Sequence, residues 1–230
     1  AALRDDGDGR VQHPPEAACP GGGETRAEAA RRIAGGLAAL LARPERVILA
    51  VTHGRIDIHR KGLDVLVEAW RRFDRPAGGR RLVLVGAGQD DERFRALLAA
   101  AHLPSIDWQP RYTTDRSEIR TWLNAADVYV SASRVEGMPV APLEAMASGL
   151  PVVCSRAQGL PDIFALGEGH GGILVPCDDP EAIAVGLRRL ERDPSLAAAL
   201  GVAGQARVDD HFSIEAVGQS LRTFLASEIA

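Results

Sequence analysis

The stretch VYVSASRVEGMPVAPLEAMASGLPVVC, residues 128–154, contains a complete strand–helix–strand unit. Its two ends, residues 128–131 and 152–154, are short apolar runs, as expected of strands buried on both faces of a parallel sheet. Pro139 and Pro142 are tolerated only in a first helical turn, so the stretch predicts a helix over 139–148 that begins near Met138. Two parallel strands joined by a helix form the repeating unit of an α/β fold.

The same alternation of strand and helix continues on both sides of this unit. Apolar runs predict strands at 47–52, 82–85, 106–108, 128–131, 152–154 and 172–175. Helical spacing follows each of them, at 61–73, 91–101, 116–125, 139–148, 161–165 and 179–192. The pattern predicts a doubly wound, Rossmann-like parallel sheet in a single domain. Two further helices, at 195–208 and 214–227, are expected to pack across the sheet or to dock on a neighbouring domain.

The composition limits the classes of function. With 27 basic and 31 acidic residues spread along the chain, no basic footprint is available for a nucleic-acid partner. The three cysteines lack a C-x-x-C spacing, which argues against a disulfide framework or a zinc cluster and favours a reducing cytoplasm. Neither a transmembrane run of ~18 apolar residues nor an export signal is present, so we expect a soluble, cytoplasmic protein.

The N-terminal part differs from the rest of the chain. Residues 1–23 are rich in Gly, Pro and Asp and have no apolar period, which predicts a flexible tail. From Glu24 to Ala42 the apolar residues recur at three- and four-residue steps, which predicts one amphipathic helix.

Ligands of parallel sheets bind at the carboxyl ends of the strands, where helix starts offer free N–H groups to anions. After the first strand, Arg55 and Lys61 can both point at one anion, and their charges suit a diphosphate, although solvated surface cations remain the alternative. After the second strand, Gly86-Ala87-Gly88 is too short for a dinucleotide fingerprint and is equally compatible with a plain tight turn.

Two carboxylates flank the predicted helix start at Met138: Glu136 on the loop and Glu144 about two turns into the helix. Carboxylates there would repel a phosphate unless they bind its neutral neighbours. The hydroxyls of two sugars on either side of a diphosphate meet this requirement, and a nucleoside diphosphate sugar has that arrangement. The sequence therefore favours a nucleotide-sugar site.

Several of these motifs together resemble the C-terminal domain of glycosyltransferase family 4, the group 1 transferases of GT-B architecture. The resemblance runs from Gly54 to the end of the chain. It rests on the Gly54-Arg55 start with Arg60-Lys61-Gly62, the two glutamates eight positions apart, Gly149-Leu150-Pro151, Gly171 to Pro176, Asp179 to Ile183, and Phe212 to Glu215.

This resemblance implies a role for each matching residue. The catalytic group would be Arg55, Lys61 and Glu136, the two cations holding the donor diphosphate. The transferred sugar would be held by Glu136 and the backbone of Gly137, Met138, Pro139 and Val140. Glu144 would hold the ribose, and the loop Gln109–Arg111 would cradle the base, although that loop departs from the family form. The turn Gly159-Leu160-Pro161-Asp162 also departs from the family's usual Gly-Gly-x-Pro-Glu.

The N-terminal part contains Pro20-Gly21-Gly22-Gly23-Glu24-Thr25, then an Ala- and Arg-rich predicted helix and the stretch Arg46 to Gly54. With these features, residues from about 11 to 54 resemble a different family, the later part of the histidine phosphatase (phosphoglycerate mutase) superfamily; the helix and strand of that origin span 24–53. By that resemblance His53 would belong to a phosphate pocket, but no Arg-His-Gly triplet with the nucleophilic histidine occurs in the chain. The predicted strand 47–52 serves either family, so the two would meet at His53-Gly54. A natural fusion, a designed chimera and a sequence-assembly artefact all remain open as origins.

Three functions follow from these observations. The resemblance implies a retaining glycosyltransferase that uses a nucleotide sugar such as a UDP- or GDP-hexose, without a metal or other cofactor. Two such domains would need roughly 350 residues, so we expect the donor-binding half alone, with the domain for a sugar, lipid or small-molecule acceptor missing. The alternatives are a catalytically silent nucleotide-sugar-binding module or chimeric fragment and, third, a histidine phosphatase-like phosphohydrolase.

Overall fold

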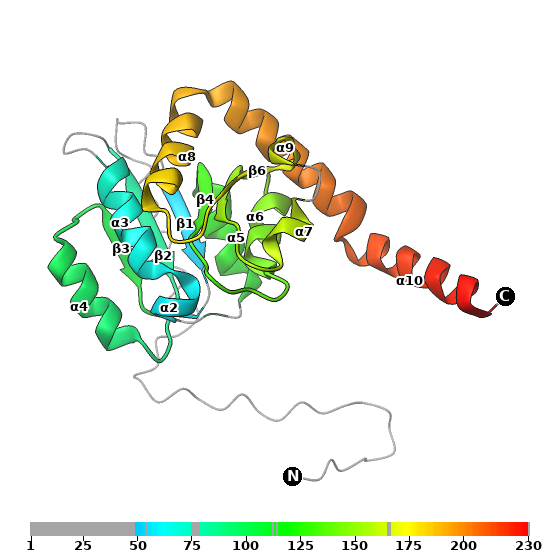
Figure 1. Cartoon of the computed structure of the whole chain (residues 1–230), viewed down its shortest axis with the longest axis horizontal. Coiled ribbons are helices and arrows are strands. Elements are labelled where there is room, and N and C mark those ends of the chain that lie inside the picture. Colours follow the sequence, from blue (N-terminus) through cyan, green and yellow to red (C-terminus); the bar gives the residue numbers. More distant parts are fainter. Residues whose placement is uncertain are drawn as a thin grey trace, which may run out of the picture.

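The computed structural model describes residues 49–53, 55–74, 79–111, 113, 115–164 and 167–229, with the backbone alone for 49–53, 168, 228 and 229. The predicted tail at 1–23 and the predicted helix at 24–42 lie outside these residues. The described part contains one sheet of six parallel strands in the order β3-β2-β1-β4-β5-β6 (Figure 1). The strands are β1 Leu49–His53, β2 Arg81–Val85, β3 Ile106–Gln109, β4 Val128–Ser131, β5 Val152–Ser155 and β6 Gly172–Val175.

Helices follow the strands along the chain. They are α2 Ile58–Lys61, α3 Leu63–Phe73, α4 Asp91–Ala101, α5 Arg116–Ala125, α6 Val140–Ala147, α7 Leu160–Ile163, the 3₁₀ helix η1 Glu168–His170, α8 Pro180–Arg192, α9 Pro194–His211 and α10 Ile214–Ile229. This is the strand order of the doubly wound fold, in which the chain reverses direction across the sheet between β1 and β4. The predicted fold class is confirmed.

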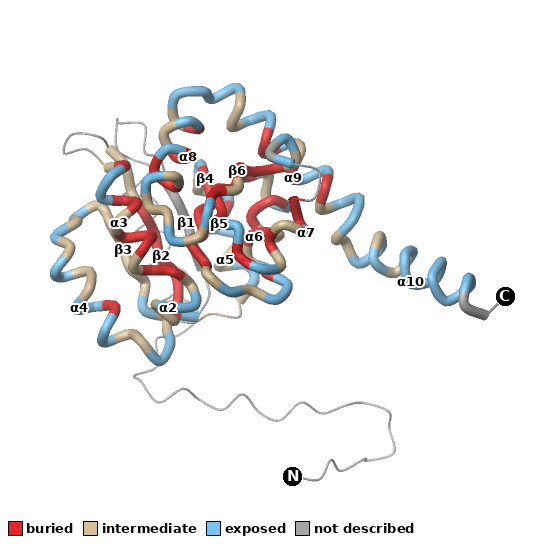
Figure 2. The backbone as a smooth tube through the Cα atoms, viewed as in Figure 1, coloured by how far each residue is buried: buried red, intermediate tan, exposed pale blue. Residues whose placement is uncertain are grey.

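Two hydrophobic clusters cover the two faces of the sheet (Figure 2). Alternate residues of one strand enter different clusters: Leu82 and Leu84 pack with α3, α4 and α8, whereas Val83 and Val85 pack with α5, α6 and α7. Successive side chains of a strand point to opposite faces, so this alternation places helices on both sides of the sheet.

The predicted helix at 61–73 is interrupted at its start. Gly62 adopts a left-handed backbone (φ 58°), ends α2 and begins α3. A Cβ atom at this position would lie 2.0 Å from the carbonyl oxygen of Ala132, so only glycine allows α2 to approach the loop after β4. The helical period identified the element but did not indicate this break.

Helix α6 begins at Val140, two residues after the predicted start near Met138. Pro139 is its N-cap residue with an extended backbone (φ −76°, ψ 105°), and Pro142 lies in the first turn. Both prolines therefore occupy positions where the missing N–H costs no helical hydrogen bond.

The two C-terminal helices have different surroundings. Helix α9 packs against α6, α8 and η1, whereas α10 extends away from the body of the domain (Figure 1). Most of α10 is exposed (Figure 2). Its exposed apolar residues include Ile214, Leu221 and Phe224. Within the described residues, no helix has the length and apolar character needed to span a membrane.

Candidate functional site

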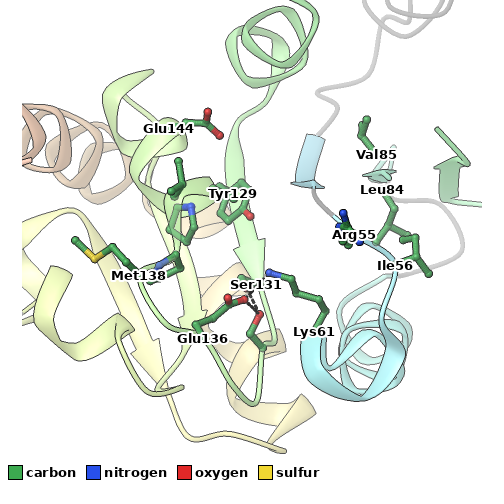
Figure 3. Close-up of a pocket in the computed structure, with 15 residues that line it drawn as sticks. Arg55, Ile56, Lys61, Leu84, Val85, Tyr129, Ser131, Glu136, Met138 and Glu144 are labelled. Carbon is green, nitrogen blue, oxygen red and sulfur yellow. Dashed lines mark hydrogen bonds and ion pairs between the residues drawn. The ribbon is translucent and has the colours of Figure 1, made fainter. Parts of the chain in front are cut away.

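A cavity of about 270 Å³ opens at the carboxyl edge of the sheet, where β1 and β4 lie side by side (Figure 3). This is the position at which doubly wound sheets bind their ligands. Of the eight predicted site residues, all but Gly137 line the cavity: Arg55, Lys61, Glu136, Met138, Pro139, Val140 and Glu144. The structure therefore brings the predicted residues of segment 55–61 together with those of segment 136–144.

Lys61 and Glu136 form an ion pair in this cavity. Lys61 Nζ donates to Glu136 Oε1 at 2.6 Å, and the Glu136 side chain is only 9% exposed. The Ser133 hydroxyl donates to the same oxygen at 2.7 Å. The carboxylate thus has two donors on one oxygen, and these donors compensate its charge.

A group of buried serines forms hydrogen bonds next to Glu136. The hydroxyls of Ser131 and Ser133 are 3.1 Å apart, and the Ser155 hydroxyl donates to the backbone carbonyl of Ser133. Cys154 is buried beside them, and its burial, together with the nearby charge of Glu136, raises the pKa of the thiol. The sequence analysis missed these serines, although the alternating Ser-Ala-Ser at the end of a buried strand was a usable signal.

Arg134 connects the loop that carries Glu136 to three other segments. Its guanidinium contacts Asp64 Oδ2 at 2.8 Å, Asp178 Oδ1 at 2.5 Å and the carbonyl oxygen of His59 at 2.8 Å. The hydrogen bond with Asp64 raises the pKa of Arg134, despite partial burial. Burial alone would raise the pKa of Asp64, but the hydrogen bond and charge of Arg134 lower it. This network could not be predicted from the sequence, because the two aspartates are 70 and 44 residues away from Arg134.

Two glycines, Gly159 and Gly88, pack closely against the backbone of the segments that form the site. At Gly159 (φ 87°), a Cβ atom would lie 1.8 Å from the carbonyl oxygen of Gly137, so the turn that departs from the family pattern packs directly on the site loop. At Gly88, a Cβ atom would lie 2.3 Å from the carbonyl oxygen of Ile56. The Gly86–Gly88 segment therefore allows a close approach to the chain after β1.

Glu144 occupies a different part of the cavity. It projects from α6, apart from Lys61 and Glu136 (Figure 3). It also lines a second cavity of about 360 Å³ between α5 and α6. The loop predicted to cradle a base, Gln109–Arg111, does not line the first cavity, and Arg111 forms an ion pair with Glu118.

Within the described residues, no three His, Cys, Asp or Glu side chains are close enough together to hold a metal ion. His53 ends β1, but its side chain lies outside what the structure describes. The chemistry of the cavity thus rests on one ion pair, one further cation and one further carboxylate. A helix start completes this arrangement.

Comparison with known proteins gives a consistent family. The family model for glycosyl transferases group 1 matches residues 46–193, a range that includes β1. The amylovoran biosynthesis glycosyltransferase AmsK of Erwinia amylovora is 30% identical over 164 residues, which cover 67% of this chain and 39% of that protein. The chain spans about two fifths to one half of the length of the curated relatives that it matches over most of its length.

Solved structures share the fold. The C-terminal domain of LpcC, a glycosyl transferase group 1 family protein of Francisella tularensis, is 25% identical with a TM-score of 0.66, and the match covers 78% of this chain and 92% of that domain. HepE of Anabaena, solved in complex with UDP-glucose, is 19% identical with a TM-score of 0.69, over 86% of this chain and 53% of HepE. From the family match and the fold, the chain belongs to the group 1 glycosyl transferases.

Proposed function

We propose that the chain is the donor-binding half of a retaining glycosyltransferase whose donor is a nucleoside diphosphate hexose with UDP or GDP. The observation that carries the proposal is the single cavity where Arg55, Lys61, the start of α6 and two separated carboxylates meet. In this cavity the cations can hold a diphosphate, and each carboxylate can accept hydrogen bonds from the hydroxyls of one sugar.

Each residue has a defined role in this proposal. Arg55 and Lys61 bind the diphosphate and stabilise the negative charge that develops on it as the sugar leaves, with help from the N-terminus of α6. Glu136 and the backbone from Gly137 to Val140 hold the transferred sugar, and Glu144 holds the ribose. The cations replace a metal ion in this role, so the reaction needs none.

The UDP-glucose complex of HepE supports the choice of donor, because HepE shares this fold and binds a nucleotide sugar. A nucleotide-sugar-binding module without transferase activity of its own is the second candidate. The same cavity supports it, because the residue roles proposed above account for donor binding alone. A phosphohydrolase that uses His53 is the least supported, because the chain contains no Arg-His-Gly triplet.

Isothermal titration with UDP, GDP, UDP-glucose and GDP-mannose tests the proposal. We expect one base to bind more tightly than the other. Replacing both Arg55 and Lys61 by Ala should weaken that binding more than tenfold, because charge-assisted hydrogen bonds contribute about 1.5–3 kcal/mol each.

The control is the double variant Arg192→Ala, Arg222→Ala, which removes the same total charge from the end of α8 and from α10. Its affinity should equal that of the unmodified chain. Equal affinities in the two double variants, or no binding of any of the four ligands, would refute the proposed site.

A further inference from the structure

The proposed donor site depends on two opposed side chains from different segments. Lys61 is the last residue of α2, and Glu136 lies on the loop between β4 and α6. They are 75 positions apart in the sequence, and neither lies within a long, rigid element. Some other contact must therefore keep the short helix and the loop at a fixed separation.

The backbone immediately beside this pair makes one such contact. The carbonyl oxygen of Arg60 accepts hydrogen bonds from the N–H of Arg134 at 2.9 Å and from the N–H of Val135 at 3.4 Å. Arg60 precedes Lys61, and Val135 precedes Glu136. The loop and the helix are thus joined one residue away from the two side chains that face the ligand.

The side chain of Arg134 strengthens the same junction. It is 17% exposed and contacts the helix side through His59 and Asp64, and the loop after β6 through Asp178. Asp178 has a left-handed backbone (φ 58°), which is uncommon for a residue other than glycine. This conformation places its carboxylate on Arg134, whose guanidinium does not line the cavity.

We infer that Arg134 is a positioning residue that sets the separation of Lys61 and Glu136, and so couples the diphosphate site to the sugar site. The inference rests on the proposed function. Arg134 touches no ligand in this scheme, and it acts through the two residues that do. A nucleotide sugar needs both Lys61 and Glu136 at once, whereas a free nucleotide diphosphate needs Lys61 but not Glu136. Loss of Arg134 therefore weakens the sugar-bearing ligand selectively.

The chain contains a matched control for this test. Arg188 has a side chain that is 19% exposed, forms an ion pair with Glu181 and donates to the carbonyl oxygen of Arg72. It joins α8 to α3 in the same manner, but away from the cavity. Arg134→Gln and Arg188→Gln each remove one bridging guanidinium, so a general loss of stability should be similar in the two variants.

The measurement is the dissociation constant of the preferred nucleotide diphosphate and of its hexose conjugate, by titration of the full chain. Arg134→Gln should raise the dissociation constant of the conjugate by about tenfold and that of the free nucleotide by less than threefold, since small misplacements of binding groups have large effects. Arg188→Gln should change neither. Arg134→Lys should recover part of the loss, and Asp178→Asn should show a smaller loss of the same kind, because Asn tolerates the left-handed backbone.

A double-mutant cycle separates positioning from general destabilisation. In a Glu136→Gln background, Arg134→Gln should have little further effect on the ratio of the two affinities, because the residue through which it acts is already changed. The inference would be overturned if the losses of affinity from Arg134→Gln and Glu136→Gln simply add in the double variant. Equal losses of affinity in Arg134→Gln and Arg188→Gln would also overturn it. If Arg134→Gln does not fold, the Arg134→Lys and Asp178→Asn results decide in the same way. Failure of the unmodified chain to bind any donor would instead refute the proposed function.

Discussion

The loop that carries Glu136 and the helix that carries Glu144 form two walls of one cavity, and they are held in different ways. The loop is fixed by contacts from α2, β5, the turn at Gly159 and the Arg134 network, and its carboxylate is nearly buried in an ion pair. Helix α6 presents Glu144 on a regular surface that is open to two cavities. The loop that carries Glu136 is thus preorganised for its ligand, whereas α6 contributes one carboxylate, Glu144, from a regular helix.

The largest effect is expected where the preorganised wall is broken. Gly159→Ala places a Cβ atom 1.8 Å from the Gly137 carbonyl oxygen at a positive φ. We expect a loss of unfolding free energy on the order of 3 kcal/mol together with loss of nucleotide-sugar binding. Thermal denaturation and titration check this. Gly169→Ala is the control, because a Cβ atom there meets nothing within 4 Å. Equal stability of the two variants would contradict the packing described.

The two carboxylates should respond differently to neutralisation. Glu144→Gln should weaken the free nucleotide and the nucleotide sugar alike, by about tenfold, the size of one charged hydrogen bond. Glu136→Gln should weaken the nucleotide sugar but strengthen the free nucleotide diphosphate a few-fold, because it releases Lys61 from its 2.6 Å ion pair. Titration of both variants with both ligands checks this, and the same pattern in the two variants would show that the walls are equivalent.

A smaller effect is expected from the pH dependence of the Arg134 network. Arg134 keeps the pKa of Asp64 below its usual value of 3.8. The ionised carboxylate therefore stabilises the fold fully above that pH, and the contribution is lost as the pH falls through the folded-state pKa. Asp64→Asn should melt at a lower temperature than the unmodified chain at pH 7, and the difference should narrow toward pH 3. A difference that does not change with pH would exclude this electrostatic role.

The smallest effect is expected at His53, at the end of β1 beside the cationic residues. His53→Ala should leave phosphomonoesterase activity at zero in both proteins, because no nucleophilic histidine is available. It should reduce diphosphate affinity only slightly, and more at pH 6 than at pH 8, since an unperturbed histidine has a pKa of about 6.5. Colorimetric phosphatase assays and titration at both pH values check this. Steady turnover that His53→Ala abolishes would support the phosphatase interpretation instead.

The sequence predicted the fold well because its strands are short, apolar and separated by helices with a clear period. Every strand of the sheet was expected within two residues of its observed bounds. The predicted helix boundaries were wrong where tertiary contacts determine them. At Gly62, the left-handed backbone that allows the approach to Ala132 divides the predicted helix. Seven of the residues that line the cavity were predicted from motifs that are local in the sequence. Arg134 was missed because its partners come from distant segments that only the folded chain brings together. Ser131 and Ser133 are close to Glu136 in the sequence, and their Ser-Ala-Ser pattern was a usable signal.

Because Cys154 is buried beside the site, the reactivity of its thiol can report local opening of the sheet edge. Its thiol is fully enclosed, and the raised pKa keeps it protonated at neutral pH, so an alkylating reagent can react only when the carboxyl edge of β5 separates from its neighbours. In a chain with the other two cysteines replaced by serine, the rate of alkylation would report the frequency of that separation. A donor that bridges the loop and α2 should lower this rate, so the thiol can measure how strongly ligand binding closes the edge of the sheet.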